Sequence, residues 1–361
     1  MRLRFLTYVW ILVVCALFSS SSNALHAQST RLYVGNSIAD NISVIDLNSL
    51  KVIGDINVGP HVHGMAAQAD GTRLFTTSEG DNTLRVFDTS TDKLISKIKL
   101  TGRPNQCAVT PDGKYVAVPI RDGDSVDIVD TAQQKVVKVL PVKAPHNAFN
   151  AGSNRYLFVS SMGDRAINRI DLDSMDYDAN VPAGGVPRPY VITRDGQTMY
   201  VAESDLHGFV IVNIPEKKVV RRVEMPAEHP KPHEHPYEPI NTLTHGLALS
   251  PDEQELWVTS LLDDAMYVYD VKSQKIVGRV TTGSGPNWVA FSPDGKYVCV
   301  SNTADDDVSI IDVKARREAA RLKVGRVPKR LVAATVPAGE PAKPSRPGEG
   351  AAAKSERVQG R

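Results

Sequence analysis

Three of the nine histidines, His229, His233 and His235, lie in one proline-rich string, PAEHPKPHEHPYEPI, at residues 226–240. Imidazole is the commonest side-chain ligand for transition metals, and it titrates near neutral pH. A string of this composition could therefore hold a metal ion or contact an anion. Which of these it does depends on the residues that the fold places beside it.

The middle of the chain repeats itself with a period of about 42 residues. Segments such as TPDGKYVAV and SPDGKYVCV mark the repeat, and the turn positions are spaced by 42, 41, 42, 57 and 42 residues: Asp70, Asp112, Ser153, Asp195, Asp252 and Asp294. Between the turns lie alternating runs such as VDIVD, rich in β-branched residues, which predict about four short strands per repeat. Four-stranded units at this period indicate a β-propeller.

The number of repeats predicts the number of blades. The first strands of the blades are expected near residues 63, 105, 146, 188, 245, 287 and 329, which makes seven. RLYVGNS, NISVIDL and KVIGDINV at the start match the second to fourth strands of a repeat, and RLVAATV at the end matches a first strand. We therefore expect an all-β domain over residues 28–336: a seven-bladed β-propeller of four-stranded antiparallel blades. Its ring is closed by N-terminal strands that pair with the C-terminal strand, which leaves no unpaired edge.

Each repeat carries one polar or charged residue seven positions before its turn, where the central funnel should open. These mouth residues are His63, Asn105, His146, Arg188, His245, Asn287 and Lys329. The long 57-residue spacing places its excess at about residues 226–241, in the connection between blades four and five on the same face. His61, two residues before His63, and His207, in a loop between a second and a third strand, are expected on this face too.

The funnel has three interpretations. A metal site could use His61, His63, His146, His245, His233 and His235, with copper, zinc or iron as the ion. An anionic small ligand could be held by Arg188, Lys329 and protonatable histidines. The third interpretation is an ordinary solvated funnel in which the histidines make structural hydrogen bonds, since no HExxH or CxxC ligand motif is present.

Several phrases of the repeat resemble the YVTN family of propeller repeats: SPDGKYVCVSN, DNTLRVFDTSTDKLISKI and NISVIDLNSLKVIGDINVG. The resemblance covers residues 29–336 and implies the propeller fold, while it is weakly specific for function. The repeats are also similar to those of the cytochrome d1 propeller, in which funnel histidines and basic residues hold an unusual haem. This likeness implies a non-covalent haem near His63, His146, His245 and Arg188. No CxxCH motif is present, so no c-type haem is expected.

The two ends of the chain differ from the repeats. Residues 1–27 have the basic, apolar and small-polar regions of a signal peptide, with cleavage expected after Ala27. We therefore expect export to the periplasm or the outside of the cell. Residues 337–361 are rich in Pro, Ala, Gly and charge and are expected to be a disordered tail. No further segment is long and apolar enough to span a membrane.

Composition narrows the functional classes. The formal net charge is +1, and it becomes −1 once Arg2 and Arg4 leave with the signal peptide, so nucleic acid is not an expected partner. Cys107 and Cys299 fall in non-adjacent repeats, and no disulfide is expected. We predict a monomeric, exported scaffold that binds a small ligand or a protein partner at the histidine-rich face. The alternative is a periplasmic metal- or haem-dependent oxidoreductase or hydrolase that uses the same funnel.

Overall fold

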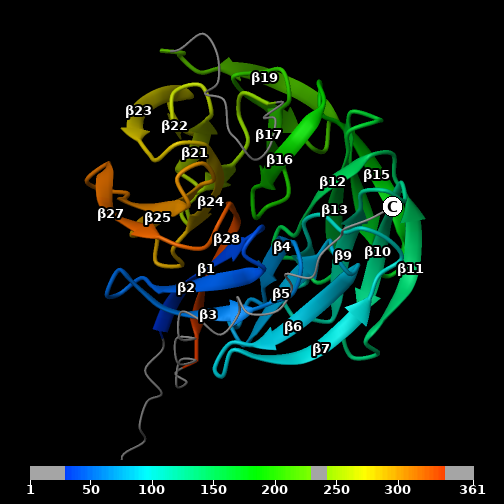
Figure 1. The fold of residues 1–361 in the computed structure, drawn as a ribbon. Coiled ribbons are helices and arrows are strands. Elements are labelled where there is room, and N and C mark those ends of the chain that lie inside the picture. Colours follow the sequence, from blue (N-terminus) through cyan, green and yellow to red (C-terminus); the bar gives the residue numbers. More distant parts are fainter. Residues whose placement is uncertain (1–28, 229–241, 338–361) are drawn as a thin grey trace, which may run out of the picture.

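The computed structural model describes residues 29–228 and 242–337, and every regular element in these ranges is a β-strand. Seven four-stranded sheets surround a central axis (Figure 1). Neighbouring strands within each sheet are antiparallel throughout. The predicted seven-bladed β-propeller is therefore confirmed. In the described part of the chain, no helix is long and apolar enough to cross a membrane.

The blades follow the sequence order. Blade one has β4 (Val62–Ala67), β5 (Arg73–Ser78), β6 (Thr83–Asp88) and β7 (Lys93–Lys99). Blade two has β8 (Ala108–Val109), β9 (Tyr115–Ile120), β10 (Ser125–Asp130) and β11 (Lys135–Pro141). Blade three has β12 (Pro145–Phe149), β13 (Tyr156–Ser161), β14 (Ala166–Asp171) and β15 (Asp176–Pro182). Blade four has β16 (Pro187–Ile192), β17 (Thr198–Glu203), β18 (Gly208–Asn213) and β19 (Lys218–Glu224).

The remaining blades complete the ring. Blade five has β20 (Leu247–Leu249), β21 (Glu255–Ser260), β22 (Ala265–Asp270) and β23 (Lys275–Thr281). Blade six has β24 (Pro286–Phe291), β25 (Tyr297–Asn302), β26 (Asp307–Asp312) and β27 (Arg317–Lys323). Blade seven joins β28 (Pro328–Val336) to β1 (Ser29–Asn36), β2 (Asn41–Asp46) and β3 (Lys51–Asn57).

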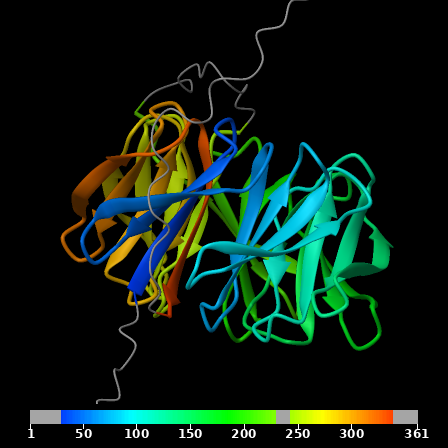
Figure 2. The same ribbon diagram turned by 60° about the horizontal axis from the view of Figure 1, so that its bottom comes forward.

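Blade seven closes the ring as the sequence predicts. β28 pairs with β1 along its whole length, from Ser29 opposite Val336 to Asn36 opposite Pro328. Figures 1 and 2 show the two strands side by side, although they come from opposite ends of the described chain. An open ring would leave these edges of β28 and β1 unpaired, whereas here they pair with each other.

The hydrophobic core of the described residues consists of seven clusters, and each joins the facing sides of two neighbouring blades. The cluster between blades seven and one, for example, contains Tyr33, Ile42 and Met65, all nearly inaccessible to solvent. Cys107 and Cys299 are buried in separate clusters and are not joined in a disulfide. Stability therefore comes from apolar burial between blades.

The turn acids have a local function. In four of the turns between first and second strands, a Ser or Thr hydroxyl two residues earlier donates to the Asp carboxylate, as Ser292 does to Asp294 at 2.6 Å. The same carboxylate accepts the N–H of Lys296 at 3.0 Å. These short-range bonds satisfy backbone donors in a tight turn, which explains why the turn position repeats so clearly in the sequence.

Candidate functional site

All seven predicted mouth residues line a single cavity of about 480 Å³ at one end of the central channel, which we call the histidine cavity. Each blade contributes one of them: His63, Asn105, His146, Arg188, His245, Asn287 and Lys329. The structure adds further lining residues, chiefly Arg121, Met162, Thr242, Leu261 and Arg330. A 42-residue period thus brings together side chains that are far apart in the chain.

A backbone device positions four of the mouth residues. In blades one, three, five and six, the N–H just below the mouth donates to a hydroxyl on the second strand instead of to a backbone carbonyl. The pairs are Gly64 with Thr77, Asn147 with Ser160, Gly246 with Thr259, and Trp288 with Ser301. In blade four the equivalent residue is Pro189, which has no N–H. The pairing between the first and second strands is interrupted at this position in blades one, three, four and six, and the residue before it lines the cavity.

His63 is held by partners on both ring nitrogens. Its Nδ1 lies 2.7 Å from Glu79 Oε1, and its Nε2 lies 3.1 Å from Nη2 of Arg330. A guanidinium can only donate, so Nε2 accepts and Nδ1 carries the proton. Burial lowers the pKa of His63 to about 4, despite its hydrogen bond to Glu79. His63 is therefore neutral near pH 7, and neither nitrogen is available without breaking a bond.

Glu79 is the common partner of His63, Arg103 and Arg121 at the rim between blades one and two. Burial would raise the pKa of its carboxyl, but hydrogen bonds from His63 and Arg103 and the charge of Arg121 hold it well below its usual range. Arg103 Nε and Arg121 Nη1 each lie 2.9 Å from the carboxylate. Glu79 thus remains ionised, and it fixes the orientation of His63.

His146 and His245 form the second histidine feature. Their rings meet edge to face with centroids 6.1 Å apart, and each residue is 8% exposed. His245 Nδ1 lies 3.0 Å from the Asn287 carbonyl oxygen, which can only accept. The Nε2 of His245 therefore keeps its lone pair. His146 Nδ1 is buried and has no hydrogen-bond partner among the described residues.

Both of these imidazoles are neutral near pH 7. Burial lowers the pKa of His146 well below its ordinary value, and His245 and Arg188 lower it further. Burial has the same effect on the pKa of His245, with the charge of Arg330 as the next cause. A buried imidazole beside cations stays unprotonated, because its charged form would lose hydration and be repelled by the neighbouring positive charges.

The charged side chains that line the histidine cavity are cationic. Arg121, Arg188, Lys329 and Arg330 contribute to its wall, and no carboxylate belongs to the lining within residues 29–228 and 242–337. Arg188 Nε donates to Ser204 Oγ at 2.8 Å. The guanidinium of Arg330 stacks on Trp288, 4.2 Å from the ring centroid. These contacts hold two of the cations in defined positions.

Two predicted members of the histidine face do not line the cavity. His61 has a φ of 53°, is exposed and does not line the cavity, because the chain is not extended between it and His63. His207 lies between Met225 O at 3.2 Å and Ser260 Oγ at 2.8 Å, so it links blades four and five. His229, His233 and His235 lie outside the described residues, as do most of the 226–241 insertion, the predicted signal peptide and the tail.

The described residues provide no set of ligands that supports the metal hypothesis. Within them, no group of three His, Cys, Asp or Glu side chains is placed to hold a metal ion. His63, His146 and His245 share one cavity, but His63 is engaged through both nitrogens. His233 and His235, two further ligands of the metal hypothesis, lie outside the part of the chain that the structure describes.

Sequence reasoning did not single out Arg121, Arg330 or Glu79. Arg121 and Glu79 occupy the same repeat position, directly after the second strand of their blades, and their N–H groups bond back to the segment before the first strand. This position recurs at Ser37, Met162, Ser204, Leu261 and Thr303 with the same bond. Listing the residues at this second repeat position, as was done for the mouth position, would have identified Arg121 and Glu79.

The burial of neutral histidines predicts that stability depends on pH. The free energy of unfolding should fall as the pH is lowered from about 6.5, the ordinary pKa of histidine, because the unfolded chain gains protons that the folded chain excludes. For His63 this stability is lost between about 6.5 and the folded value of about 4. Each such group adds a slope that approaches about 1.4 kcal/mol per pH unit.

Urea unfolding at pH 7, 6 and 5 measures this slope. The variant His146→Leu should show a shallower dependence, because one proton-binding group has been removed from the unfolded state. A free energy that is the same at pH 7 and pH 5, or a slope unchanged by the substitution, would contradict neutral buried histidines.

Two family models match the sequence. The model of the YNCE-like beta-propeller matches residues 72–234, and the model described as "Lactonase, 7-bladed beta-propeller" matches residues 154–329. No curated protein matches the sequence. The two overlapping matches agree with the repeat and with the observed ring of seven blades.

Several solved structures have a similar fold. Hydrazine synthase of Kuenenia stuttgartiensis is 20% identical, with 78% of this chain and 92% of that chain covered and a TM-score of 0.65. A functionally unknown protein from Desulfotomaculum acetoxidans is 13% identical, with 85% and 99% covered and a TM-score of 0.71. The dihydro-heme d1 dehydrogenase NirN, in complex with DHE, is 17% identical, with 83% and 74% covered and a TM-score of 0.60. At these identities the likeness concerns the fold.

Proposed function

We propose that this chain, a seven-bladed β-propeller of YVTN-type repeats, is an exported binding protein that holds an anionic small molecule in its histidine cavity. One observation carries the proposal: four cationic side chains and three neutral histidines line one cavity of about 480 Å³. A volume of this size suits a small molecule. Cations in a partly desolvated cavity interact strongly with carboxylate or phosphate groups.

The neutral histidines give the proposed site a second property. The pKa of His146 and of His245 is lowered by burial and then by neighbouring positive charge. A bound anion offsets that charge, so the pKa of each imidazole should rise on binding. His146 Nδ1 is buried and has no described partner, so a turn of the ring would let it donate to the anion. Binding is therefore expected to be coupled to proton uptake.

Calorimetric titration with citrate, a compact polycarboxylate, tests the proposal. Citrate should bind more tightly at pH 5.5 than at pH 7.5, and the heat should vary with the ionisation enthalpy of the buffer, as proton uptake requires. Choline, a cation of similar size, should not bind. Absence of citrate binding at both pH values in low salt would refute the anion proposal.

A haem-type tetrapyrrole is the second candidate, and a specific observation favours it. The Nε2 of His245 keeps a lone pair because its Nδ1 donates to Asn287 O. Such a nitrogen could ligate iron, while Arg188 and Lys329 could contact the carboxylates of the macrocycle. NirN was solved in complex with DHE, and it supports this candidate only by likeness of fold. The bound iron would supply redox chemistry, which the haem-dependent oxidoreductase form of the enzyme alternative would use.

Optical titration with haem separates the two candidates. Haem bound through an imidazole should give a shifted Soret band, and this band should be lost in His245→Ala. Asn105→Ala, which changes another mouth residue, is the control and should keep the band. A spectrum of free haem at all ratios, together with citrate binding, would leave the small-anion function alone.

A further inference from the structure

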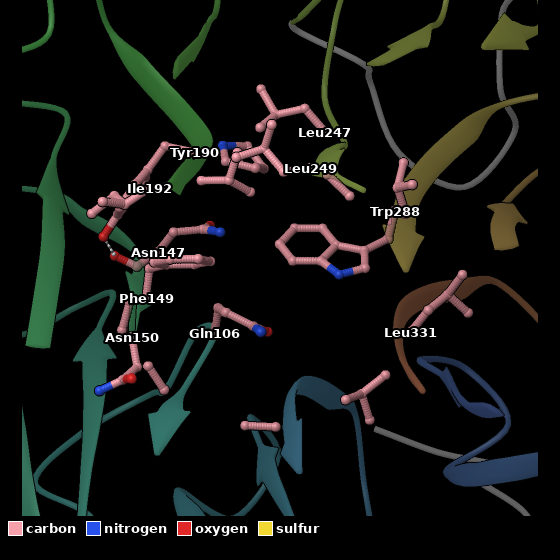
Figure 3. A pocket seen from close by; sticks show the side chains of 18 of the residues that line it. Gln106, Asn147, Phe149, Asn150, Tyr190, Ile192, Leu247, Leu249, Trp288 and Leu331 are labelled. Carbon is pink, nitrogen blue, oxygen red and sulfur yellow. Dashed lines mark hydrogen bonds between the residues drawn. The ribbon is translucent and has the colours of Figure 1, made fainter. Parts of the chain in front are cut away.

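The opposite end of the central channel holds a second cavity, of about 470 Å³, which we call the aromatic cavity. Its wall comes from the same first strands, one to four residues beyond the mouth positions, and from the turns that follow them. Figure 3 shows Phe149, Tyr190, Leu247, Leu249 and Leu331 around this space. The two cavities share no lining residue. They are therefore separate sites with different chemistry.

Trp288 separates the two cavities. Its ring lines the aromatic cavity, while Arg330, stacked 4.2 Å from the ring centroid, lines the histidine cavity. His245 packs against the same indole, with ring centroids 6.0 Å apart. Figure 3 shows the indole extending from its strand into the middle of the space, with Asn147 and Phe149 on the wall across from it. A planar aromatic surface is thus offered to a ligand.

Asn147 places an unsatisfied acceptor in this wall. The residue is 3% exposed, and its Oδ1 is buried with no hydrogen-bond partner among the described residues. The nearby amide of Gln106 is different, because its Nε2 donates to Met65 O and its Oε1 accepts from Met65 N. A buried acceptor without a donor costs stability, so it is a feature that a ligand donor would satisfy.

The charges at the aromatic cavity favour a neutral ligand. Among its described lining residues, the ionisable acids and bases other than Tyr190 and Cys107 are Arg194 and Glu253. Both belong to turns at the rim, and they are tied together: the Arg194 N–H donates to Glu253 Oε1 at 2.8 Å, and its guanidinium donates to Pro251 O. The pKa values of Tyr190 and Cys107 are raised by burial, so both groups are neutral.

We infer that the aromatic cavity binds a neutral, planar aromatic compound that carries one N–H or O–H donor. The ring stacks against Trp288 and the apolar wall, and the Asn147 amide, whose Oδ1 is covered by protein atoms, rotates to accept a hydrogen bond from the donor. The stacking surface, the orphan acceptor and the absence of interior charge in the described wall each select one part of this ligand. This site is independent of the anion site proposed above, because it has its own lining and favours a neutral ligand over an anionic one.

Ligand-observed NMR titration of the full-length protein with indole and with N-methylindole tests the inference. Indole has the ring and the donor, whereas N-methylindole keeps the ring and lacks the donor. Indole should bind saturably and about 3- to 10-fold more tightly than N-methylindole, which is the range of one neutral hydrogen bond. Saturating citrate should not displace either compound, because citrate belongs to the other cavity.

Substitutions at two residues identify the contacts. Asn147→Leu should abolish the preference for indole over N-methylindole, while thermal stability stays the same or rises, because the orphan acceptor is gone. Trp288→Leu should weaken both compounds by more than 10-fold, and Trp288→Phe, a gentler change, should weaken them less. Lys329→Gln, in the histidine cavity, is the matched control and should leave both affinities unchanged.

The inference is overturned by any of three results. The first is no saturable indole binding up to its solubility limit. The second is an indole preference that persists in Asn147→Leu. The third is an indole affinity that falls in Lys329→Gln while the folded Trp288→Phe variant binds as the wild type does, since the compound would then occupy the histidine cavity.

Discussion

Deletion of residues 29–58 is expected to leave a chain without a cooperative unfolding transition. These residues form β1, β2 and β3, so their loss removes three of the four strands of blade seven. β28 would lose its pairing partner, and the clusters on both sides of the blade would lose buried residues such as Tyr33, Ile42 and Leu32. Losing two of seven blade interfaces exceeds the marginal stability of a folded domain. Circular dichroism during heating, with binding of a hydrophobic dye, measures the effect.

A circular permutant is the matched control. Ser29 lies opposite Val336, so a short Gly-Ser linker from residue 336 to residue 29 can close this pair as a hairpin. A chain that runs from residue 61 to 336 and then through the linker to residues 29–58 keeps every strand pair. It should unfold cooperatively at a temperature near that of the wild type. A deletion variant that also unfolds cooperatively would show that ring closure is dispensable.

Replacing Arg188 and Lys329 together with glutamine is expected to weaken citrate binding by about 100-fold or more. Both side chains line the histidine cavity, and Arg188 is held in place by its bond to Ser204. A hydrogen bond to a charged group contributes about 1.5–3 kcal/mol, so two such losses together reach this range. Calorimetric titration at constant salt and pH gives the affinities.

The matched control changes the same charges elsewhere. Arg73 and Lys138 are both exposed and lie outside the lining of the cavity, so Arg73→Gln with Lys138→Gln alters the net charge equally. Citrate affinity in this variant should remain within about twofold of the wild type. Equal losses in the two double variants would mean that overall charge, and not the histidine cavity, attracts citrate. Thermal melting of both variants confirms that each is folded.

The blade count and the mouth residues could be predicted because every blade is a local unit. Its strands pair with sequence neighbours, and its turn acids bond within a few residues, as Ser292, Asp294 and Lys296 do. Equivalent residues in a closed ring must occupy equivalent positions around one axis. The period therefore placed His63, His146 and His245 at one cavity without any knowledge of contacts between blades.

First-strand boundaries were predicted less well. β8 contains only Ala108 and Val109, and β20 begins at Leu247, two to three residues beyond the expected starts. In blade two, the Gln106 N–H donates to the side-chain Oδ1 of Asn105, and in blade five the Gly246 N–H donates to Thr259. Side chains thus replace ladder bonds at the mouth. This competition between side-chain and backbone hydrogen-bond partners cannot be predicted from the spacing of apolar residues.

Sequence periodicity was sufficient to predict the seven-bladed ring, its closure by β1 and β28, and the ring of polar side chains at one mouth. The chemical state of those side chains depends on contacts between blades, which no repeat encodes. The proton of His63 lies on Nδ1 because Glu79 and Arg330, far apart in the chain, meet its two nitrogens. The orphan acceptor of Asn147 and the partition at Trp288 arise in the same way. Burial and partner geometry set ionisation and hydrogen bonding, and both exist only once the blades have packed around the axis.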